Sequence, residues 1–304
     1  MEMIRKENLE EIGSNSFSIG IYVGGETSNN TRKSAIANFN SLKNNDYGAK
    51  SKFIISKCPW CSAEIGYSKE FKTFVGIQLT RNPDTVSLHC REFECQFSDS
   101  LPIYTIDEDI YSFTPSLLIG TVDKFAMMAW RPDSRSIFGF GSDGQRKADP
   151  PSLIIQDELH LISNALGSAV GFYETILERM STKNFTSDTN NTSLMVKPKI
   201  VCSTATIRNS NKQLLGLYGR NKSLIFPPSG LDIRDSFLAV EDEKTEEKIY
   251  LGVFTPSLST QQTQVDIYTG LYLVPSKFKN CSEQDPFWTN VLYFNSIREL
   301  QATK

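Results

Sequence analysis

Two short apolar segments that end in polar side chains place the strongest constraint on the fold of this chain. The first, residues 151–160, reads PSLIIQDELH, and its apolar run ends at Asp157 and Glu158. The second, residues 200–206, reads IVCSTAT and ends in small hydroxyl side chains. Such apolar runs are typical of strands buried in a parallel sheet, where ligands bind at the carboxyl ends. We therefore expect an α/β domain with a ligand site at the ends of these two strands.

The two carboxylates suit phosphate chemistry. An aspartate at a strand end can hold Mg²⁺ on a nucleotide, and a neighbouring glutamate can orient and deprotonate the attacking water. The same pair also occurs as a helix N-cap beside a solvated acid, so the pair alone leaves both alternatives open. The chain contains no Gly-Lys pair, and it therefore lacks the phosphate-binding loop G-x-x-x-x-G-K-[ST].

Length and charge set only broad limits on function. The 304 residues suffice for two domains or one large one, and a net charge of −3 gives no overall basic field. Contacts with nucleic acid must therefore come from local patches. No apolar run approaches the roughly 18 residues of a membrane span, and the charged N-terminal sequence MEMIRKE lacks the apolar core of a signal peptide. We expect a cytoplasmic protein with no membrane contact.

Four of the six cysteines form two close pairs that can supply a tetrahedral metal site. Cys58 and Cys61 have two residues between them, and Cys90 and Cys95 have four. Two such pairs can give four thiolates to one Zn²⁺ and so hold a small ribbon together. His89 is an alternative ligand, and a redox role for the first pair is a further alternative. We predict a structural zinc, because four thiolates leave no open position for catalysis.

Alternating strand and helix patterns indicate a three-layer α/β domain with a parallel sheet. The zinc ribbon is expected as an insertion at 53–101, with an inner hairpin around 71–79. The other expected elements are strands at 17–25, 116–121, 151–157 and 200–206, helices at 34–42, 122–130 and 163–180, a flexible connector at 134–149 and a polar loop at 182–192.

A proline-rich turn at 226–230 and a charge run at 241–248 mark a boundary between two parts of the chain. We assign residues 1–235 to a first domain that contains the zinc insertion. Residues 236–304 then form a linker and the beginning of a second α/β domain. In this second part the patterns predict strands at 248–254 and 287–295 and a helix at 260–273.

Taken in chain order, four segments resemble motifs of superfamily 2, DEAH-like helicases. Residues 118–125 (LIGTVDKF) are similar to motif Ib, 157–160 (DELH) to motif II, 203–206 (STAT) to motif III and 291–296 (VLYFNS) to motif IV. The resemblance implies a RecA-like first domain, incomplete at its N-terminal side, and the start of a second RecA-like domain.

Longer matches point to one group within this superfamily. The segments DELHLIS at 157–163, STATIR at 203–208, LYGR at 217–220 and FPPSGL at 226–231, together with the cysteine insertion, resemble the helicase subunits of DISARM anti-phage systems. This resemblance covers nearly the whole chain. It implies an antiviral defence role, with DNA and other defence-system subunits as partners.

The helicase resemblance also implies a role for each matched residue. Asp157 would hold Mg²⁺ through water, and Glu158 would be the general base toward the γ-phosphate of ATP. His160 and motif III would couple the nucleotide state to the neighbouring domain, and Thr121 and Lys124 would contact phosphates of a bound strand. Outside this resemblance, Lys124 reads as an ordinary surface lysine. Motif III consists of Ser203, Thr204, Ala205 and Thr206.

Parts of the helicase pattern are missing: the phosphate-binding loop, motifs V and VI, and an arginine finger. Gly219 and Arg220 read as a helix-end turn. We expect an internal piece of a DNA helicase or translocase that does not hydrolyse ATP alone and uses ATP and Mg²⁺ only when the missing motifs are supplied. Two alternatives remain: a non-catalytic zinc-containing module that binds nucleic acid or partner subunits, and a decayed gene product.

Overall fold

The computed structural model describes the chain except for residues 1, 45–50, 163, 187–192, 205–209, 229–230, 233, 236, 243–249 and 304. The chain divides into two compact units, Met1–Leu224 and Ile225–Lys304. Each unit is described by itself below.

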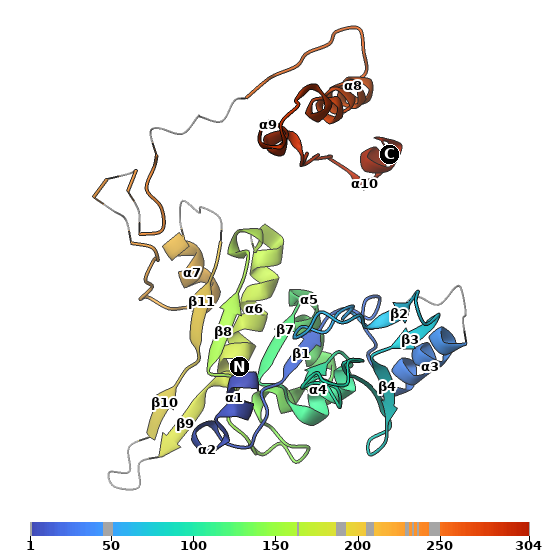
Figure 1. Ribbon diagram of the computed structural model, residues 1–304. Helices are drawn as coiled ribbons and strands as arrows, with labels where there is room; N and C mark the ends of the chain where they lie inside the picture. Colours follow the sequence, from blue (N-terminus) through green and yellow to red (C-terminus); the bar gives the residue numbers. More distant parts are fainter. Residues whose placement is uncertain are drawn as a thin grey trace. The chain divides into compact units, whose positions relative to one another are not determined.

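The first unit is a mixed α/β structure with two parallel sheets (Figure 1). Strand β1 (Ile19–Tyr22) pairs in parallel with β6 (Ile103–Tyr104) on one side and with β7 (Leu117–Gly120) on the other. Strand β8 (Leu153–Gln156) pairs in parallel with β11 (Lys199–Cys202). These pairings confirm the predicted α/β class and its parallel strands.

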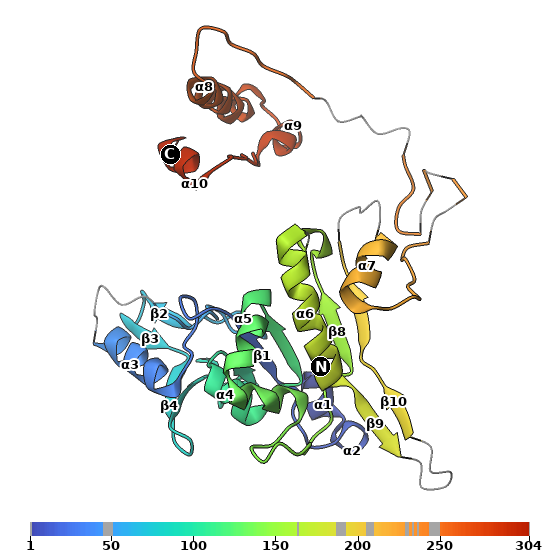
Figure 2. The same cartoon turned by 180° about the vertical axis from the view of Figure 1, so that it is seen from behind.

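Helices cover one face of these sheets, as the views from both sides show (Figure 2). The other face of β7, β8 and β11 is exposed, so the third layer of the predicted three-layer domain is not formed over these strands by the described residues. Tyr22 of β1 is fully buried and packs in one cluster with Leu118 of β7 and Phe125. Cys202 of β11 packs in another cluster with Leu217. The helices that supply these clusters are α4 (Asp107–Phe113), α5 (Val122–Ala126), α6 (Asn164–Ser181) and α7 (Ser210–Tyr218).

The segment predicted as a flexible connector at 134–149 packs into the core over residues 134–139, so the prediction was wrong for this part, whereas residues 142–145 and 147–149 are exposed. It begins in a 3₁₀ helix, η2 (Pro132–Phe138), whose Ile137 and Phe138 are buried in the cluster of Tyr22. Gly139 then turns the chain with a φ of 77°. A Cβ at this glycine would lie 2.1 Å from the carbonyl oxygen of Ala148, so this turn requires glycine.

The polar stretch predicted as a loop at 182–192 is partly a hairpin. Strand β9 (Lys183–Thr186) pairs antiparallel with β10 (Ser193–Val196), and residues 187–192 lie outside the described residues. Backbone pairing with the second strand thus decides the conformation here, where the polar composition favours a loop.

The cysteine insertion contains two hairpins where one was predicted. Strand β2 (Gly66–Ser68) pairs with β3 (Thr73–Val75), and β4 (Ile77–Thr80) pairs with β5 (Thr85–Leu88). The predicted hairpin at 71–79 covers β3 and β4, which belong to different hairpins. The remaining elements of the first unit are α1 (Glu2–Glu7), α2 (Leu9–Ile12), α3 (Arg32–Lys43) and two 3₁₀ helices, η1 (Met127–Trp130) and η3 (Leu159–Leu161).

Among the described residues of the second unit, the regular elements are all helices, and they begin at residue 260. The helix α8 (Thr260–Leu273) starts at the N-cap Ser259, whose side chain accepts a hydrogen bond from the backbone of Gln262, and it confirms the predicted helix. The others are α9 (Cys281–Gln284), α10 (Ile297–Thr303) and the 3₁₀ helices η4 (Pro275–Lys277) and η5 (Asp285–Phe287).

The two strands predicted in the second unit are not formed in its described part. Residues 250–254 and 288–294 have no strand pairing, and residues 285–287 form η5. A β-strand needs a neighbour to accept and donate its backbone hydrogen bonds. No described segment of this unit provides such a neighbour, so the apolar pattern alone does not give a strand.

Candidate functional site

The two polar strand ends singled out in the sequence lie side by side. Strands β8 and β11 run parallel in a register that sets Gln156 opposite Cys202. Just beyond, the backbone N–H of Ser203 donates to the carbonyl of Gln156 at 2.9 Å, and the N–H of Leu159 donates to the carbonyl of Ser203 at 3.0 Å. The two chain segments therefore stay joined after the strands end, and their polar side chains share one edge of the sheet.

Asp157 is an exposed carboxylate with two hydrogen-bond donors on one oxygen. Its Oδ1 accepts a short hydrogen bond from the Ser203 hydroxyl and another, of 2.9 Å, from the backbone N–H of Glu158. The Ser203 hydrogen bond, followed by that of Glu158, lowers the pKa of Asp157 below its ordinary value. Asp157 is therefore ionised at neutral pH and able to bind a cation.

Glu158, His160 and Thr204 form the second half of this site. The Nδ1 atom of His160 lies 3.2 Å from Glu158 Oε2 and 3.4 Å from the hydroxyl of Thr204. Glu158 has a left-handed backbone with φ of 52°, which non-glycine residues adopt at a cost on the order of 1 kcal/mol. The histidine ring thus bridges a carboxylate on one strand end and a hydroxyl on the other.

A buried leucine and a glutamine hold this turn in place. Leu159 is 1% exposed and packs under the site. Gln213, on α7, donates from Nε2 to the carbonyl oxygens of Leu159 at 3.1 Å and of Ile162 at 2.7 Å. This role of Gln213 was not predicted, because a glutamine on a helix surface carries no signal of such a role. The last two predicted motif III residues, Ala205 and Thr206, lie outside the described residues.

The two residues predicted to contact nucleic acid differ in accessibility. Thr121 is exposed and precedes α5 directly after the carboxyl end of β7. Lys124 is 8% exposed, and its Nζ lies 2.7 Å from Asp107 Oδ2 and 2.9 Å from the amide oxygen of Asn30. It also lies 5.0 Å from the centre of the Tyr22 ring. In this conformation the ammonium group of Lys124 is engaged inside the protein.

Asp107 and Asn30 were not predicted as partners of Lys124. They lie at the start of α4 and in the loop after β1, far apart in sequence, so only the fold brings them together. Burial raises the pKa of Asp107 above its ordinary value, and the contact with Lys124 opposes that rise. The ion pair therefore ties the loop after β1, α4 and α5 together at the carboxyl end of the sheet.

Arg220, considered above as part of a helix-end turn, has a structural set of partners. Gly219 ends α7 with a φ of 61°, and its N–H donates to the carbonyl of Leu215. Arg220 then donates to Glu178 Oε2 at 2.6 Å and to the carbonyl of Pro198 at 2.9 Å. The helix-end interpretation is confirmed.

A buried carboxyl group lies between α6 and α7. Glu174 is 5% exposed, and its Oε2 has no hydrogen-bond partner among the described residues. Burial, with a smaller contribution from the charge of Glu178, raises the pKa of Glu174 to about 7. The same burial raises the pKa of Tyr218 well above its ordinary range.

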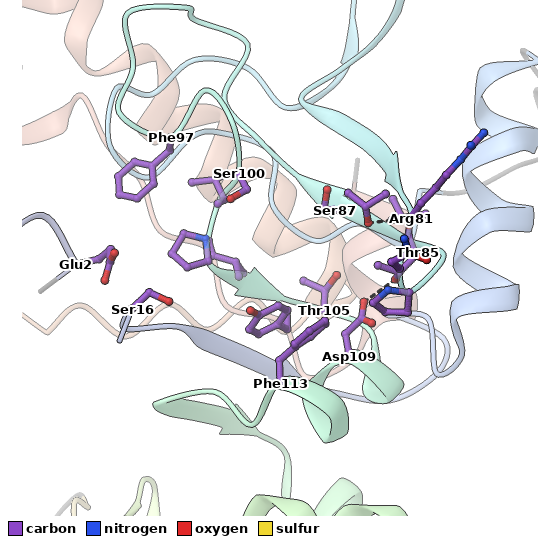
Figure 3. Close-up of a pocket in the computed structure, with 18 of the residues that line it drawn as sticks. Glu2, Ser16, Arg81, Thr85, Ser87, Phe97, Ser100, Thr105, Asp109 and Phe113 are labelled. Carbon is purple, nitrogen blue, oxygen red and sulfur yellow. Dashed lines mark hydrogen bonds between the residues drawn. The ribbon is translucent and has the colours of Figure 1, made fainter. Parts of the chain in front are cut away.

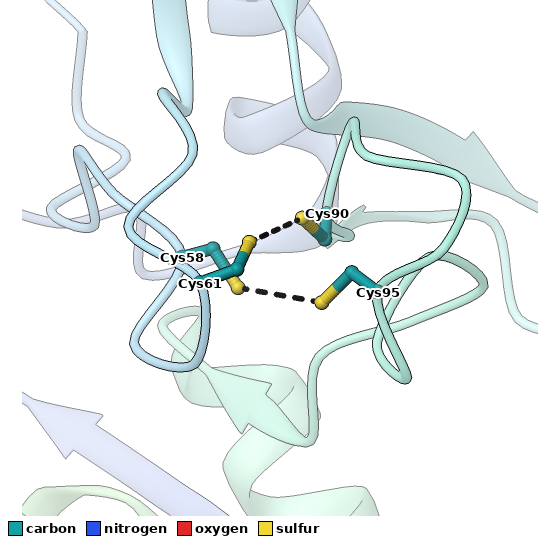
Figure 4. A group of neighbouring side chains, drawn as sticks. All are labelled: Cys58, Cys61, Cys90 and Cys95. Carbon is teal, nitrogen blue, oxygen red and sulfur yellow. Dashed lines mark hydrogen bonds between the residues drawn. The ribbon is translucent and has the colours of Figure 1, made fainter.

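The four predicted metal-binding cysteines converge in the insertion (Figure 4). Their sulfur atoms all lie within 4.8 Å of one another, with 3.9 Å between Cys58 and Cys95 and 3.3 Å between Cys61 and Cys90. A tetrahedral zinc with Zn–S bonds of about 2.3 Å places its sulfur ligands about 3.8 Å apart. The cluster therefore fits one tetrahedral metal ion.

Thiolate chemistry supports this fit. Cys58, Cys90 and Cys95 are buried, and burial raises the pKa of Cys90 to about 12. A divalent cation stabilises the thiolate form that burial disfavours. The ring nitrogen Nδ1 of His89 instead lies 3.0 Å from the backbone carbonyl oxygen of Cys90. The structure therefore favours four sulfur ligands.

A cavity of about 380 Å³ lies elsewhere in the first unit (Figure 3). It is bounded by α1, the β4–β5 hairpin, β6 and α4. The buried carboxylate that lines it, Asp109, already has partners. Its Oδ1 forms an ion pair with Arg32 Nε at 2.6 Å, and its Oδ2 accepts a hydrogen bond from the Thr85 hydroxyl at 2.6 Å. None of the residues predicted to act on a nucleotide lines this cavity.

Within the described residues, no helix is long and apolar enough to cross a membrane.

No family model matches the chain. The chain is 32% identical over 333 residues to a Bacillus paralicheniformis protein, "DISARM protein DrmA". The match includes 97% of this chain but only 29% of the relative, so the chain spans less than a third of that protein's length. The resemblance to a DISARM protein is confirmed.

Proposed function

Because nearly the whole of this chain is similar to one part of a DISARM protein, DrmA, we propose that it is a segment of an ATP-dependent DNA helicase or translocase that acts in phage defence. In this proposal, residues 1–235 are part of a first RecA-like domain, with the cysteine insertion at 53–101. Residues 236–304 are a linker and the start of a second RecA-like domain.

The contact between Asp157 and Ser203 carries the proposal. It joins an ionised, exposed carboxylate at the end of β8 to a hydroxyl at the end of β11. The carboxyl ends of parallel strands are where nucleotides bind in α/β sheets. An exposed carboxylate that stays charged at neutral pH suits a magnesium ion on a triphosphate.

The neighbouring side chains supply the other roles. Glu158 would be the general base that orients and deprotonates the attacking water. His160 lies in contact range of both Glu158 and Thr204, so a change at the γ-phosphate could reach motif III through the histidine ring. Ser203, Thr204, Ala205 and Thr206 would form this coupling segment.

A bound DNA strand would run along the carboxyl ends of the parallel strands, past the end of β7. Thr121 is exposed directly after β7 and would contact a phosphate oxygen. Lys124 would reach a phosphate only by leaving Asp107. In the described conformation its ammonium group is buried in the ion pair with Asp107 and is not available to DNA.

The cysteine cluster would hold one structural Zn²⁺ through Cys58, Cys61, Cys90 and Cys95. Four thiolate ligands close the coordination sphere, so this ion would stabilise the insertion and take no part in hydrolysis.

The test uses an extended polypeptide, defined as this chain joined to the regions that flank the matched part of the B. paralicheniformis protein. We expect it to bind a fluorescent ATP analogue with Mg²⁺. Asp157→Ala should weaken this Mg²⁺-dependent binding on the order of tenfold to a hundredfold, as loss of metal-site partners does. Asp143→Ala is the matched control, since Asp143 is an exposed aspartate paired with Lys147. Equal binding by both variants would contradict the proposal.

The second candidate, a non-catalytic zinc-containing binding module, is favoured by the cysteine cluster alone. It predicts salt-dependent DNA binding that neither ATP nor Asp157→Ala changes. The same binding assay with labelled DNA therefore separates the two functions.

A further inference from the structure

Over β1, β7, β8 and β11, one face of the two parallel sheets is open to solvent, although its side chains are apolar. At β6 this face is covered, because Ile103, the register partner of Ile19, packs against the cluster that contains Met3. Along β7, β8 and β11, exposed and half-buried residues alternate, as the two faces of a strand require. The exposed apolar members define what we name the open sheet face: Ile19 (36% exposed), Leu117 (48%), Ile119 (53%), Leu153 (48%), Ile155 (63%) and Val201 (42%).

The residues of the open sheet face lie on the same side of both sheets. The opposite, covered sides pack against the same two helices, α5 and α6. Phe125 and Leu177 contribute to the cluster that covers β1 and β7, while Val122 and Val170 contribute to the cluster that covers β11. Because one helical layer covers both sheets, their uncovered sides face the same way.

Parallel sheets are found almost only with both faces covered. Large contiguous apolar patches on a soluble protein mark a surface that another structure covers. The sheets also have free edges, since β7 and β8 are each the last strand of their sheet among the described strands. The unpaired edges can bind a further parallel strand that continues the sheet. The apolar face can bind a helix that packs on it.

We propose that the open sheet face is the docking surface for a strand–helix segment of the same longer polypeptide. This rests on the proposed function only in taking the chain as part of a longer DISARM protein. The matched region is 29% of the relative, so most of that protein lies outside it and can supply the segment. Lys199 is the one charged side chain at the exposed positions of β7, β8 and β11, and it lies on the end strand β11. The chemistry of the face therefore fits a helix with an apolar stripe.

Hydroxyl-radical footprinting tests this surface without any substitution. Modification of Ile119, Leu153 and Ile155 is measured in the 304-residue chain and in the extended polypeptide, with Trp60 as an internal reference that is 54% exposed. We expect the three residues to be modified in the chain and protected in the extended polypeptide, while Trp60 is modified in both. Equal modification of the face in both proteins would overturn the proposal.

A pair of substitutions gives an independent check. Ile155→Lys and Leu194→Lys change residues that are both exposed on strands, 63% and 64%, but Leu194 lies outside the open sheet face. We expect neither to shift the melting temperature of the 304-residue chain. In the extended polypeptide only Ile155→Lys should lower it, because the lysine would be buried.

Two further outcomes are informative. Protection in the chain alone that grows with concentration, together with a dimer mass, would show a second copy on this face and overturn the proposal. Protection in the extended polypeptide without ATP binding would support the docking proposal and contradict the proposed function. The two proposals can therefore fail independently.

Discussion

Lys124 and Asp107 form a buried ion pair, with 2.7 Å between Nζ and Oδ2 and with both side chains less than 10% exposed. The lysine predicted to contact DNA phosphates is thus a link between α4, α5 and the loop after β1. Removing one partner of a buried ion pair leaves an uncompensated charge in the interior.

Lys124→Met should therefore destabilise the first unit by about 3–5 kcal/mol. The matched control is Lys147→Met, which breaks an exposed ion pair of the same 2.7 Å length with Asp143 and should cost less than about 1 kcal/mol. Urea unfolding followed by circular dichroism measures both values. If Lys124→Met leaves stability unchanged but weakens DNA binding by the extended polypeptide, Lys124 is a phosphate contact instead.

The second prediction concerns the hydrogen bond that lowers the pKa of Asp157. Ser203→Ala removes the hydroxyl donor, so the pKa of Asp157 should rise toward its ordinary value. Thr204→Ala should leave it unchanged, because Thr204 contacts His160 and not Asp157. An NMR titration of the Asp157 side-chain carboxyl resolves the two variants, and an identical titration curve in Ser203→Ala would contradict the assigned contact.

The third prediction is that the purified chain contains one zinc ion. Cys90→Ser should abolish tight zinc binding and expose the insertion to proteolysis, because a zinc site of this kind needs all four ligands. Cys202→Ser and Cys281→Ser should keep the metal, since these cysteines lie outside the cluster. Metal content is read by atomic emission. Full zinc occupancy in Cys90→Ser would refute the four-sulfur site.

The fourth prediction follows from the raised pKa of Glu174, about 7 against an ordinary 4.5. Because the folded state holds this proton more tightly, the contribution of Glu174 is fully present below about pH 4.5. It is lost as the pH rises through 7, by on the order of 3 kcal/mol. The Glu174→Gln variant has no carboxyl group to titrate and should not show this loss. The free energy of unfolding of the variant should therefore rise relative to that of the natural chain between pH 5 and pH 8.

Glu10→Gln is the control for Glu174, because Glu10 is exposed. The measurement is thermal unfolding of the natural chain and of both variants at pH 5 and at pH 8. If Glu174→Gln and Glu10→Gln show the same pH dependence, Glu174 does not carry a raised pKa.

The two segments that form the candidate site each carry a local sequence signal. The segments at 151–160 and 200–206 were predicted as strands with polar ends, and the parallel pairing of β8 and β11 confirms it. The cysteine cluster was likewise predictable from spacing, because metal ligands come in close pairs. Both patterns have a local physical cause.

Features that depend on distant partners were not predictable. The burial of Lys124 requires Asp107 and Asn30, and nothing in the sequence around Lys124 indicates either. The connector at 134–149 is rich in glycine, serine and aspartate, yet Ile137 and Phe138 bury its first part against Tyr22. Tertiary packing determines the conformation and burial of these segments, whereas amino-acid composition indicates only their local conformational preference.

The most direct test of the proposed function is the rate of DNA-stimulated ATP hydrolysis by the extended polypeptide and by its Glu158→Gln variant. The glutamine keeps the shape of the side chain but cannot accept the proton of the attacking water. With Glu10→Gln as the control, we predict that hydrolysis is lost only in Glu158→Gln, while binding of the ATP analogue is retained. Unchanged hydrolysis in Glu158→Gln would contradict the assignment of this segment as the catalytic part of the motor.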